Sequence, residues 1–404
     1  MAPRARLGAL SVPAFRIFFI GYVVSLIGVW MQRTAQAWLV VELTDSPFYV
    51  GLVDALGTLP VLLFSLYAGA VADRVSRYRM VFVTQTFGML LGLAFAIMWY
   101  TGNATITLVA VLAAGLGIVQ AFDIPARHSF FFDLVGREHL PSAIALNSSA
   151  FNGTRAIGPS IAGVLIGAFG VGICFLLNGV TFLAVLGVML VIRKSVDRSQ
   201  PSATGRPWDR IVEGLRYVNG EPRLRRIVFN IAASSILSIP VLTLMPVLAR
   251  SVLELGAREF GWMMSAVGLG ALGGALVLAL YMHELPKGRV LAWSTAAFGL
   301  LVALVALSRS LPLTLVLLAL MGAAMIIATA LTNTLIQSIA PDEFRARVVS
   351  VYTVAFVGMA PIGAFVAGAA AERVGTATTL LVGGTLTMVT AWQLLGTNLE
   401  IRRL

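Results

Sequence analysis

Residues 69–79 read Gly69-Ala-Val-Ala-Asp73-Arg74-Val-Ser-Arg77-Tyr-Arg79, a short charged stretch between two long apolar runs. So few residues separate the runs that they must pack as antiparallel neighbours. Each run reaches the length of about 20 residues that an α-helix needs to cross a bilayer. The small Gly69 lets two such helices approach closely. The stretch therefore predicts a tight polar turn between two membrane-spanning helices.

The composition of the chain also indicates a membrane protein. Of its 404 residues, 58% are hydrophobic and only 12% are charged, whereas about 25% of the residues in a soluble domain are charged. The net charge of +11 does not indicate nucleic-acid binding, because the arginines lie mainly in loops on one side of the membrane. We expect an all-α protein embedded in the lipid bilayer, with no nucleic-acid partner.

Twelve apolar segments are long enough to be membrane spans. They cover about residues 15–42, 48–72, 80–101, 105–127, 141–168, 171–193, 225–249, 259–283, 289–308, 311–338, 347–371 and 376–399. Residues 194–223 are polar, and we expect a cytoplasmic linker whose residues 208–218 form an amphipathic helix on the membrane surface. This linker would separate an N-terminal bundle of six helices (1–193) from a C-terminal bundle of six (224–404).

An internal repeat supports this division. When the sequence is shifted by 205 residues, residues 150–170 meet residues 355–375 with eight identities, mostly small residues. A weaker match at a shift of 210 residues places Arg77 on Lys287. Chance agreement among Gly and Ala is the alternative explanation, but the loops around the stronger match align as well. Parallel repeats of six spans are one layout of secondary transporters.

The charged stretch resembles the loop signature of the major facilitator superfamily, roughly G-x-x-x-D-R-x-G-R-[RK]-[RK]. Gly69, Asp73, Arg74 and Arg79 match, whereas Ser76 replaces a glycine and Tyr78 replaces a basic residue. Residues 31–39, 124–127, 147–152, 155–159 and 341–347 resemble the bacterial drug–proton antiporters that include macrolide and siderophore exporters. The resemblance covers nearly the whole chain and implies the major facilitator fold, with two pseudo-symmetric six-helix bundles.

The distribution of arginine predicts the orientation, because cytoplasmic loops of membrane proteins are enriched in Arg and Lys. With the N-terminus inside, the outer loops hold only Arg250, Arg258, Arg309 and Arg373. Both termini would then be cytoplasmic, in a multi-pass protein of the bacterial inner membrane.

Arg33 and Asp54 are candidates for proton coupling, because ionisable groups inside a membrane are costly and usually functional. Arg33 would lie about 15 Å, and Asp54 about 10 Å, below the outer ends of consecutive spans. An ion pair whose carboxylate switches between charged and neutral forms would couple protons to transport. A static pair that closes the outer side is the alternative.

Arg155 would lie about 21 Å into the fifth span, near the bilayer midplane. Ser148 and Asn152 share its helix face, and we expect these three residues to line a substrate cavity together with Gln36. A structural role, in which Arg155 binds carbonyl or amide groups between helices, is the alternative. In the second half no carboxylate lies deep in a span, so the expected substrate contacts are the neutral residues Asn230, Asn333 and Gln337.

Gly69, Asp73, Arg74 and Arg77 are expected to form a gating latch at the inner end. Asp73 would face the positive N-terminus of the eleventh span, and Asp123 is the candidate partner of Arg74 or Arg77. Such pairs would hold an outward-open state together and break on inward opening. A solvated loop is the alternative.

The stretch Gly158-Pro159-Ser-Ile-Ala162-Gly163 resembles the fifth-span antiporter signature G-P-x-x-G-G, with Ala162 in place of one glycine. The resemblance implies an exporter, whereas close packing and a proline bend are the purely structural interpretation. The family's fourth span carries an R-x-x-Q-G motif. In this chain the glutamine of the motif is present as Gln120, but the arginine is missing.

We therefore predict a secondary active transporter that exports a small amphipathic organic molecule, such as a drug, siderophore or metabolite, by proton antiport. It would work as a monomer, with the substrate, protons and lipid as its partners. A proton-coupled importer or facilitator of the same fold is the alternative, followed by a non-transport membrane protein. The chain has one cysteine, Cys174, and three histidines without ligand spacing. We thus expect no metal site, no cofactor and no enzymatic activity.

Overall fold

The computed structural model describes residues 8–72, 74–193, 207–281 and 286–396, and every regular element in these ranges is a helix. The first half contains a short η2 (Gly8–Ser11) and five helices, α1 (Pro13–Thr44), α2 (Pro47–Ala72), α3 (Arg77–Tyr100), α4 (Ile106–Phe169) and α5 (Gly172–Ile192). The second half contains α6 (Pro207–Gly220), α7 (Pro222–Leu237), α8 (Val241–Val247), η3 (Leu248–Val252), α9 (Ala257–Tyr281), α10 (Lys287–Leu307), α11 (Leu311–Ile339), α12 (Asp342–Thr353), η4 (Val354–Gly358), α13 (Ala360–Val374) and α14 (Thr376–Gly396).

Ten helical stretches in the described part of the chain are long and apolar enough to cross a membrane. The predicted spans agree closely with them where a span is a single helix. For example, residues 289–308 were expected and α10 covers Lys287–Leu307. The described part of the chain is therefore all-α, and the protein is a multi-pass membrane protein.

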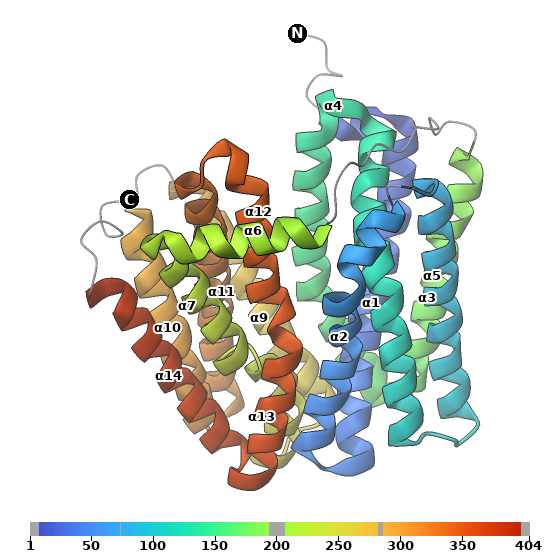
Figure 1. Ribbon diagram of the computed structural model, residues 1–404. Helices are drawn as coiled ribbons and strands as arrows, with labels where there is room; N and C mark the ends of the chain where they lie inside the picture. Colours follow the sequence, from blue (N-terminus) through green and yellow to red (C-terminus); the bar gives the residue numbers. More distant parts are fainter. Residues whose placement is uncertain (1–7, 73, 194–206, 282–285, 397–404) are drawn as a thin grey trace.

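Helix α4 contains both the fourth and the fifth predicted spans. A straight helix of its 64 residues would be about 96 Å long, roughly three times the hydrocarbon thickness of a bilayer. The helix is broken at Gly136, whose φ of 67° is in the left-handed region that favours glycine. Figure 1 shows α4 doubling back at its labelled end, with two arms that run away from the bend. Residues 128–135, expected in a loop, extend the first arm as helix.

The seventh and eleventh predicted spans are interrupted helices. Between α7 and α8 the chain forms a turn at residues 238–240, where Pro240 has no N–H to continue the helical hydrogen-bond ladder. Between α12 and α13 lies the π-helical segment η4, and Pro361 stands in the first turn of α13. Short π-helical segments of this kind are frequent at functional sites. The eleventh span also begins earlier than predicted, at Asp342.

Helix α6 lies across the ends of neighbouring helices of the second half, as Figure 1 shows in yellow-green. The ring of Tyr217 stacks on that of Phe344 in α12, with centroids 4.4 Å apart. Arg347 of α12 pairs with Glu213 of α6 at 3.0 Å. Helix α6 includes residues 208–218, where an amphipathic helix was predicted, and it is docked on α12 by these contacts. We call this end of the molecule the α6 end.

At the opposite end, which we call the Asp45 end, polar contacts join the two halves of the chain. Ser46 Oγ and the backbone N–H of Phe48 both donate to the carboxylate of Glu372, at 2.7 and 3.2 Å. Arg250 pairs with Asp45 at 2.9 Å. Figure 1 shows that α2 and α13 converge toward this end, whereas the helices of the two halves diverge toward the α6 end.

Two close helix–helix contacts, which we call the glycine seams, reinforce this junction. A Cβ added to Gly163 in α4 would lie 3.0 Å from Cα of Gly261 in α9. A Cβ added to Gly51 in α2 would lie 2.9 Å from Cα of Gly368 in α13. Only glycine allows backbones to approach so closely, as in other membrane helix pairs. The seams thus hold the halves together at the Asp45 end.

Candidate functional site

A cavity of about 650 Å³ lies between the two halves, within the range typical of sites for small organic molecules. Helices α1 to α5 supply most of its lining, and a smaller group of residues comes from the turn at residues 238–240 and from α8, α9 and α13. On α1 the lining runs from Tyr22 to Val40, a length of about 27 Å along the helix. The cavity therefore extends through much of the membrane-embedded part.

Polar atoms without a hydrogen bond gather around this cavity. Of the seven buried side-chain polar atoms that lack a partner in the described part of the chain, six belong to residues that line it. These atoms are Trp30 Nε1, Gln32 Nε2, Gln85 Oε1, Asn147 Oδ1, Arg155 Nη2 and Asn178 Oδ1. Because buried polar groups are nearly always hydrogen-bonded, their clustering indicates a wall built to bind a polar ligand or water.

The expected cavity residues of the first half all line this cavity. Arg155, Asn152 and Ser148 form one stripe on the second arm of α4, and Gln36 faces the cavity from α1. The amide nitrogen of Asn152 donates to the carbonyl of Ser148 at 2.9 Å. The shared helix face predicted from their spacing is therefore present.

The expected residues of the second half are placed elsewhere. Asn230 is buried between α10 and α14, with its amide 3.4 Å from the hydroxyl of Thr390 and its Oδ1 3.5 Å from that of Thr295. Gln337 donates to Asn333 within α11 at 2.9 Å. None of Asn230, Asn333 and Gln337 is among the residues that line the large cavity. Their polar groups are instead engaged with other side chains of the second half.

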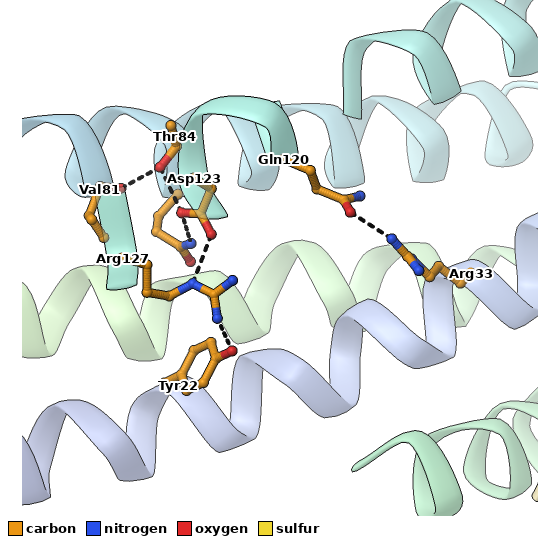
Figure 2. Close-up of polar contacts among 8 residues, drawn as sticks. Tyr22, Arg33, Val81, Thr84, Gln120, Asp123 and Arg127 are labelled. Carbon is orange, nitrogen blue, oxygen red and sulfur yellow. Dashed lines mark hydrogen bonds and ion pairs between the residues drawn. The ribbon is translucent and has the colours of Figure 1, made fainter. Parts of the chain in front are cut away.

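Arg33 and Asp54 both line the cavity, but each has a different partner from the one expected. Arg33 donates to Oε1 of Gln120 in α4 at 2.6 Å, a contact visible in Figure 2. Asp54 accepts a hydrogen bond of 2.5 Å from the hydroxyl of Thr243 in α8. The structure describes no direct ion pair between the two. Asp54 thereby links the first half of the chain to the second, which the sequence did not reveal.

A buried polar cluster surrounds Asp123. Its Oδ1 accepts from the hydroxyl of Thr84 and the amide of Gln85, each at 2.8 Å. Its Oδ2 is 3.0 Å from Nε of Arg127, one helical turn further along α4. Arg127 also contacts the hydroxyl of Tyr22 in α1, so Figure 2 shows one chain of contacts across α1, α3 and α4. Asp123 is therefore an interior residue that ties three helices together.

Asp123 does not pair with Arg74 or Arg77, as had been predicted for it. Arg77 pairs with Asp133 at 2.5 Å, and Asp133 lies ten residues beyond Asp123, about 15 Å along α4. This shift follows from the helical extension of α4 past its predicted end at residue 127. Arg74 is exposed, and Asp73 lies outside the described residues.

Gly69 does not make the close helix contact expected of it. A Cβ added there would meet no heavy atom within 4 Å, so its side-chain position faces open space among the described residues. In the antiporter-like stretch, by contrast, a Cβ on Gly158 would lie 2.6 Å from Cβ of Trp30. Gly158 thus makes room for Trp30 on α1, Pro159 is buried beside it, and Gly163 forms a glycine seam.

Two aromatic residues of the cavity were missed by the sequence reasoning. The rings of Trp30 and Phe151 meet edge to face with centroids 5.5 Å apart, and the guanidinium of Arg33 lies 5.5 Å from the Trp30 ring. Trp30 precedes Arg33 by three residues, and Phe151 precedes Arg155 by four. Helical spacing from the two intramembrane arginines would have found both.

Known proteins resemble this chain over most of its length. The multidrug efflux pump Tap of Mycolicibacterium fortuitum is 27% identical over 355 residues, 86% of each chain. The staphyloferrin A transporter of Staphylococcus aureus is 24% identical and covers 92% of this chain and 93% of its own. The enterobactin exporter EntS of Salmonella typhi is 26% identical, with 88% and 85% covered.

Solved structures share the fold. A bacterial homologue of the iron transporter ferroportin, in an inward-facing state, superimposes with a TM-score of 0.73 at 16% identity, covering 94% of this chain and 99% of that one. The nucleoside transporter NupG gives a TM-score of 0.75 at 13% identity, with 94% and 97% covered. These identities are low, so the likeness concerns the fold.

The sequence profile described as transmembrane secretion effector matches residues 4–403, almost the entire chain. Together with the relatives and the shared fold, this match identifies a transporter and not an enzyme. The chain belongs to the transmembrane secretion effector family of the major facilitator superfamily.

Proposed function

We propose that this protein exports a small amphipathic organic molecule by alternating access, driven by proton antiport. The observation that carries the proposal is the cavity of about 650 Å³ between the two halves, with its cluster of unpaired polar atoms. The contacts between the halves at the Asp45 end close one side of it. The direction of transport is supported by the relatives, which are named as an efflux pump and an exporter.

The proposed architecture has twelve membrane crossings. Helix α4 supplies two of them, because the break at Gly136 separates two arms, and α14 supplies the last. Residues 1–193 then form one six-helix bundle and residues 224–404 the other, joined by the linker 194–223. Rocking of these two bundles about the glycine seams would expose the cavity alternately to each side.

The α6 end is proposed to face the cytoplasm of a bacterial cell, with both termini on that side of the inner membrane. The positive-inside rule supports this orientation, because Arg250 and Arg309 belong to the few basic residues near the opposite end. With the Asp45 end closed, the structure would correspond to an inward-open state. The protein is proposed to act as a monomer surrounded by lipid.

Asp54 is proposed to carry the transported proton, with Arg33 tuning its charge. As a carboxylate, Asp54 accepts the hydrogen bond from Thr243 across the two halves. Protonation removes its negative charge and converts one oxygen into a donor, which changes this contact and the field at Arg33. A proton taken up by Asp54 would therefore alter a bond between the two moving parts.

Substrate is proposed to contact Arg155, Asn152, Ser148 and Gln36. The latch at the α6 end is proposed to include Gly69, Asp73, Arg74 and Arg77, with Asp133 in place of Asp123 as the partner of Arg77. Arg77 links the start of α3 to α4, so a latch there would act by keeping the first bundle rigid at that end. The outward-open state would add contacts to the second bundle.

Everted membrane vesicles from an overexpressing strain test the proposal. Respiration acidifies their lumen, and a pH-sensitive dye reports the loss of the proton gradient when a candidate drug or siderophore is added. An antiporter gives proton release that depends on the compound and on the protein, and it accumulates the compound in the lumen. A compound that instead leaves energised everted vesicles together with protons would show import, and equilibration without any proton movement would show a facilitator.

A further inference from the structure

We propose that the cavity takes an organic anion, with Arg155 binding the anionic group and the Trp30–Phe151 ring pair contacting an apolar body beside it. This inference rests on the proposed export function and names the chemical class of its substrate. It follows from the charges on the cavity wall, the unpaired donors of that wall and the position of the two rings.

The charged residues that line the cavity do not balance. They comprise three arginines and two aspartates, Arg33, Arg127, Arg155, Asp54 and Asp123, with His128 as a further titratable group. Asp123 is committed to Arg127 at 3.0 Å. Asp54 and Arg33 offset one another as charges, although their direct partners are Thr243 and Gln120. Arg155 remains as a cation with no acidic partner among the described residues.

An uncompensated cation inside a membrane is costly. Arg155 makes no hydrogen bond to any described residue, and its Nη2 atom is buried. A guanidinium offers five N–H donors in a planar fork that matches a carboxylate, sulfonate or phosphate with two parallel hydrogen bonds. An anionic ligand would therefore satisfy both the unpaired donors and the excess charge of Arg155.

The surroundings of Arg155 specify the rest of the ligand. Phe151 lies one helical turn before it on α4, and its ring meets that of Trp30 at 5.5 Å between centroids. The indole Nε1 of Trp30 is a further buried donor without a partner. The second-half wall adds the apolar side chains of Phe260 and Met264. An anion with a flat or aromatic body complements this combination of charge, rings and apolar surface.

Paired probes of the same shape test this inference by equilibrium binding to the purified full-length protein in lipid nanodiscs. The probes are 2-naphthoate, an anion, and 2-naphthamide, its neutral analogue. The variants are Arg155→Gln, Arg155→Lys and the control Arg258→Gln, since Arg258 is packed on Trp262 and does not line the cavity. The comparison of the two probes on the wild-type protein requires no variant to fold.

We expect the wild-type protein and Arg258→Gln to bind naphthoate at least about tenfold more tightly than naphthamide, the effect of one charge-assisted hydrogen-bonding contact. Arg155→Gln should abolish that preference and leave naphthamide binding unchanged, and Arg155→Lys should restore part of it. Equal binding of both probes, no detectable binding of naphthoate, or a preference that survives in Arg155→Gln would each overturn the inference.

Failure of this inference can be separated from failure of the proposed function. Everted vesicles that accumulate a neutral or cationic drug with proton release, and do so equally in Arg155→Gln, would retain export and overturn the anion assignment. Vesicles that bind naphthoate through Arg155 without any proton-linked flux would retain the anion site and overturn proton-driven export.

Discussion

The two walls of the cavity differ in chemistry although repeat-related helices build them. At the shift of 205 residues Arg155 corresponds to Ala360, and at the shift of 210 residues Asp54 corresponds to Met264. All four positions line the cavity. The first half places charges where the second half places apolar side chains, and no charged residue of the described second half lines the cavity. The charged groups proposed for binding and coupling are thus concentrated on one wall.

The glycine seams, unlike the cavity walls, are built from matching residues in the two repeats. The same two shifts relate Gly163 to Gly368 and Gly51 to Gly261, and these four residues form the two glycine seams between the halves. The repeat has therefore kept these close packing contacts while the cavity walls diverged. Close packing between the halves thus uses glycines of both repeats, whereas the charged groups of the cavity come from one.

The largest effect is expected from the proposed proton carrier and its repeat-related counterpart. Asp54→Asn should abolish proton-coupled transport, because an amide cannot alternate between charged and neutral forms. Met264→Leu should retain transport, since an exchange of Leu and Met of similar volume is tolerated in cores. Proton release from everted vesicles measures both. Undiminished proton release in Asp54→Asn would show that the charged wall has no special role in proton coupling.

The seams should respond alike to a bulky residue. Gly163→Leu and Gly368→Leu would each force apart backbones that leave room for no Cβ, so both should open the Asp45 end and impair transport. Distances between spin labels placed on α2 and α13, or on α4 and α9, report the opening.

Gly167→Leu is the matched control, because it lies on the same arm of α4 and a Cβ there meets nothing within 4 Å. It should leave the distances unchanged. A strong effect at one seam and none at the other would show that closure is as asymmetric as the cavity walls.

The interior cluster of the first half should affect stability more than the exposed contacts of the second. Asp123→Asn leaves Arg127 buried without its counter-ion, at an expected cost of about 3 kcal/mol or more. Glu213→Gln breaks the partly exposed pair with Arg347 and should cost less than about 1 kcal/mol. Unfolding in mixed micelles at increasing SDS fraction compares them. Equal losses would argue against the cluster as a stabilising element.

A small effect, close to that of Glu213→Gln, is expected at Glu372. Gln in its place can still accept from Ser46 and Phe48 but lacks the charge that strengthens those bonds, a change of about 1 kcal/mol or about a fivefold shift in an equilibrium. Glu372→Gln should therefore populate the state open at the Asp45 end slightly more, as spin-label distances across α2 and α13 would report. A complete loss of closure would instead make this contact, and not the seams, the main junction.

Much of the fold could be predicted from the sequence because the length of a membrane span is set by the bilayer. The ends of α10 and α11 were predicted within two residues for this reason. The continuation of α4 past residue 127 was not, since residues 128–135 lie beyond the length of about 20 residues that the bilayer requires of a span. Asp133 becomes the partner of Arg77 only because the helix extends to it.

The candidate site was predictable on one side only. Spacing along a single helix placed Arg155, Asn152 and Ser148 on one face, and that face does line the cavity. The partners of Arg33 and Asp54 lie on α4 and α8, and no helical period in one segment reveals a contact between helices. Asn230 failed as a cavity residue because polarity alone does not say which way a span is rotated.

Proton-driven accumulation in proteoliposomes tests the central claim most directly. The purified protein is reconstituted into liposomes, and an inside-acidic pH gradient is imposed. Uptake of a labelled compound that the vesicle assay has identified as a substrate is then measured for the wild-type protein and for Asp54→Asn. The gradient drives uptake by the molecules whose α6 end faces outward. The account predicts accumulation above equilibrium that a protonophore abolishes and that Asp54→Asn lacks. Equilibration without accumulation in the wild-type protein, or equal accumulation in Asp54→Asn, would contradict it.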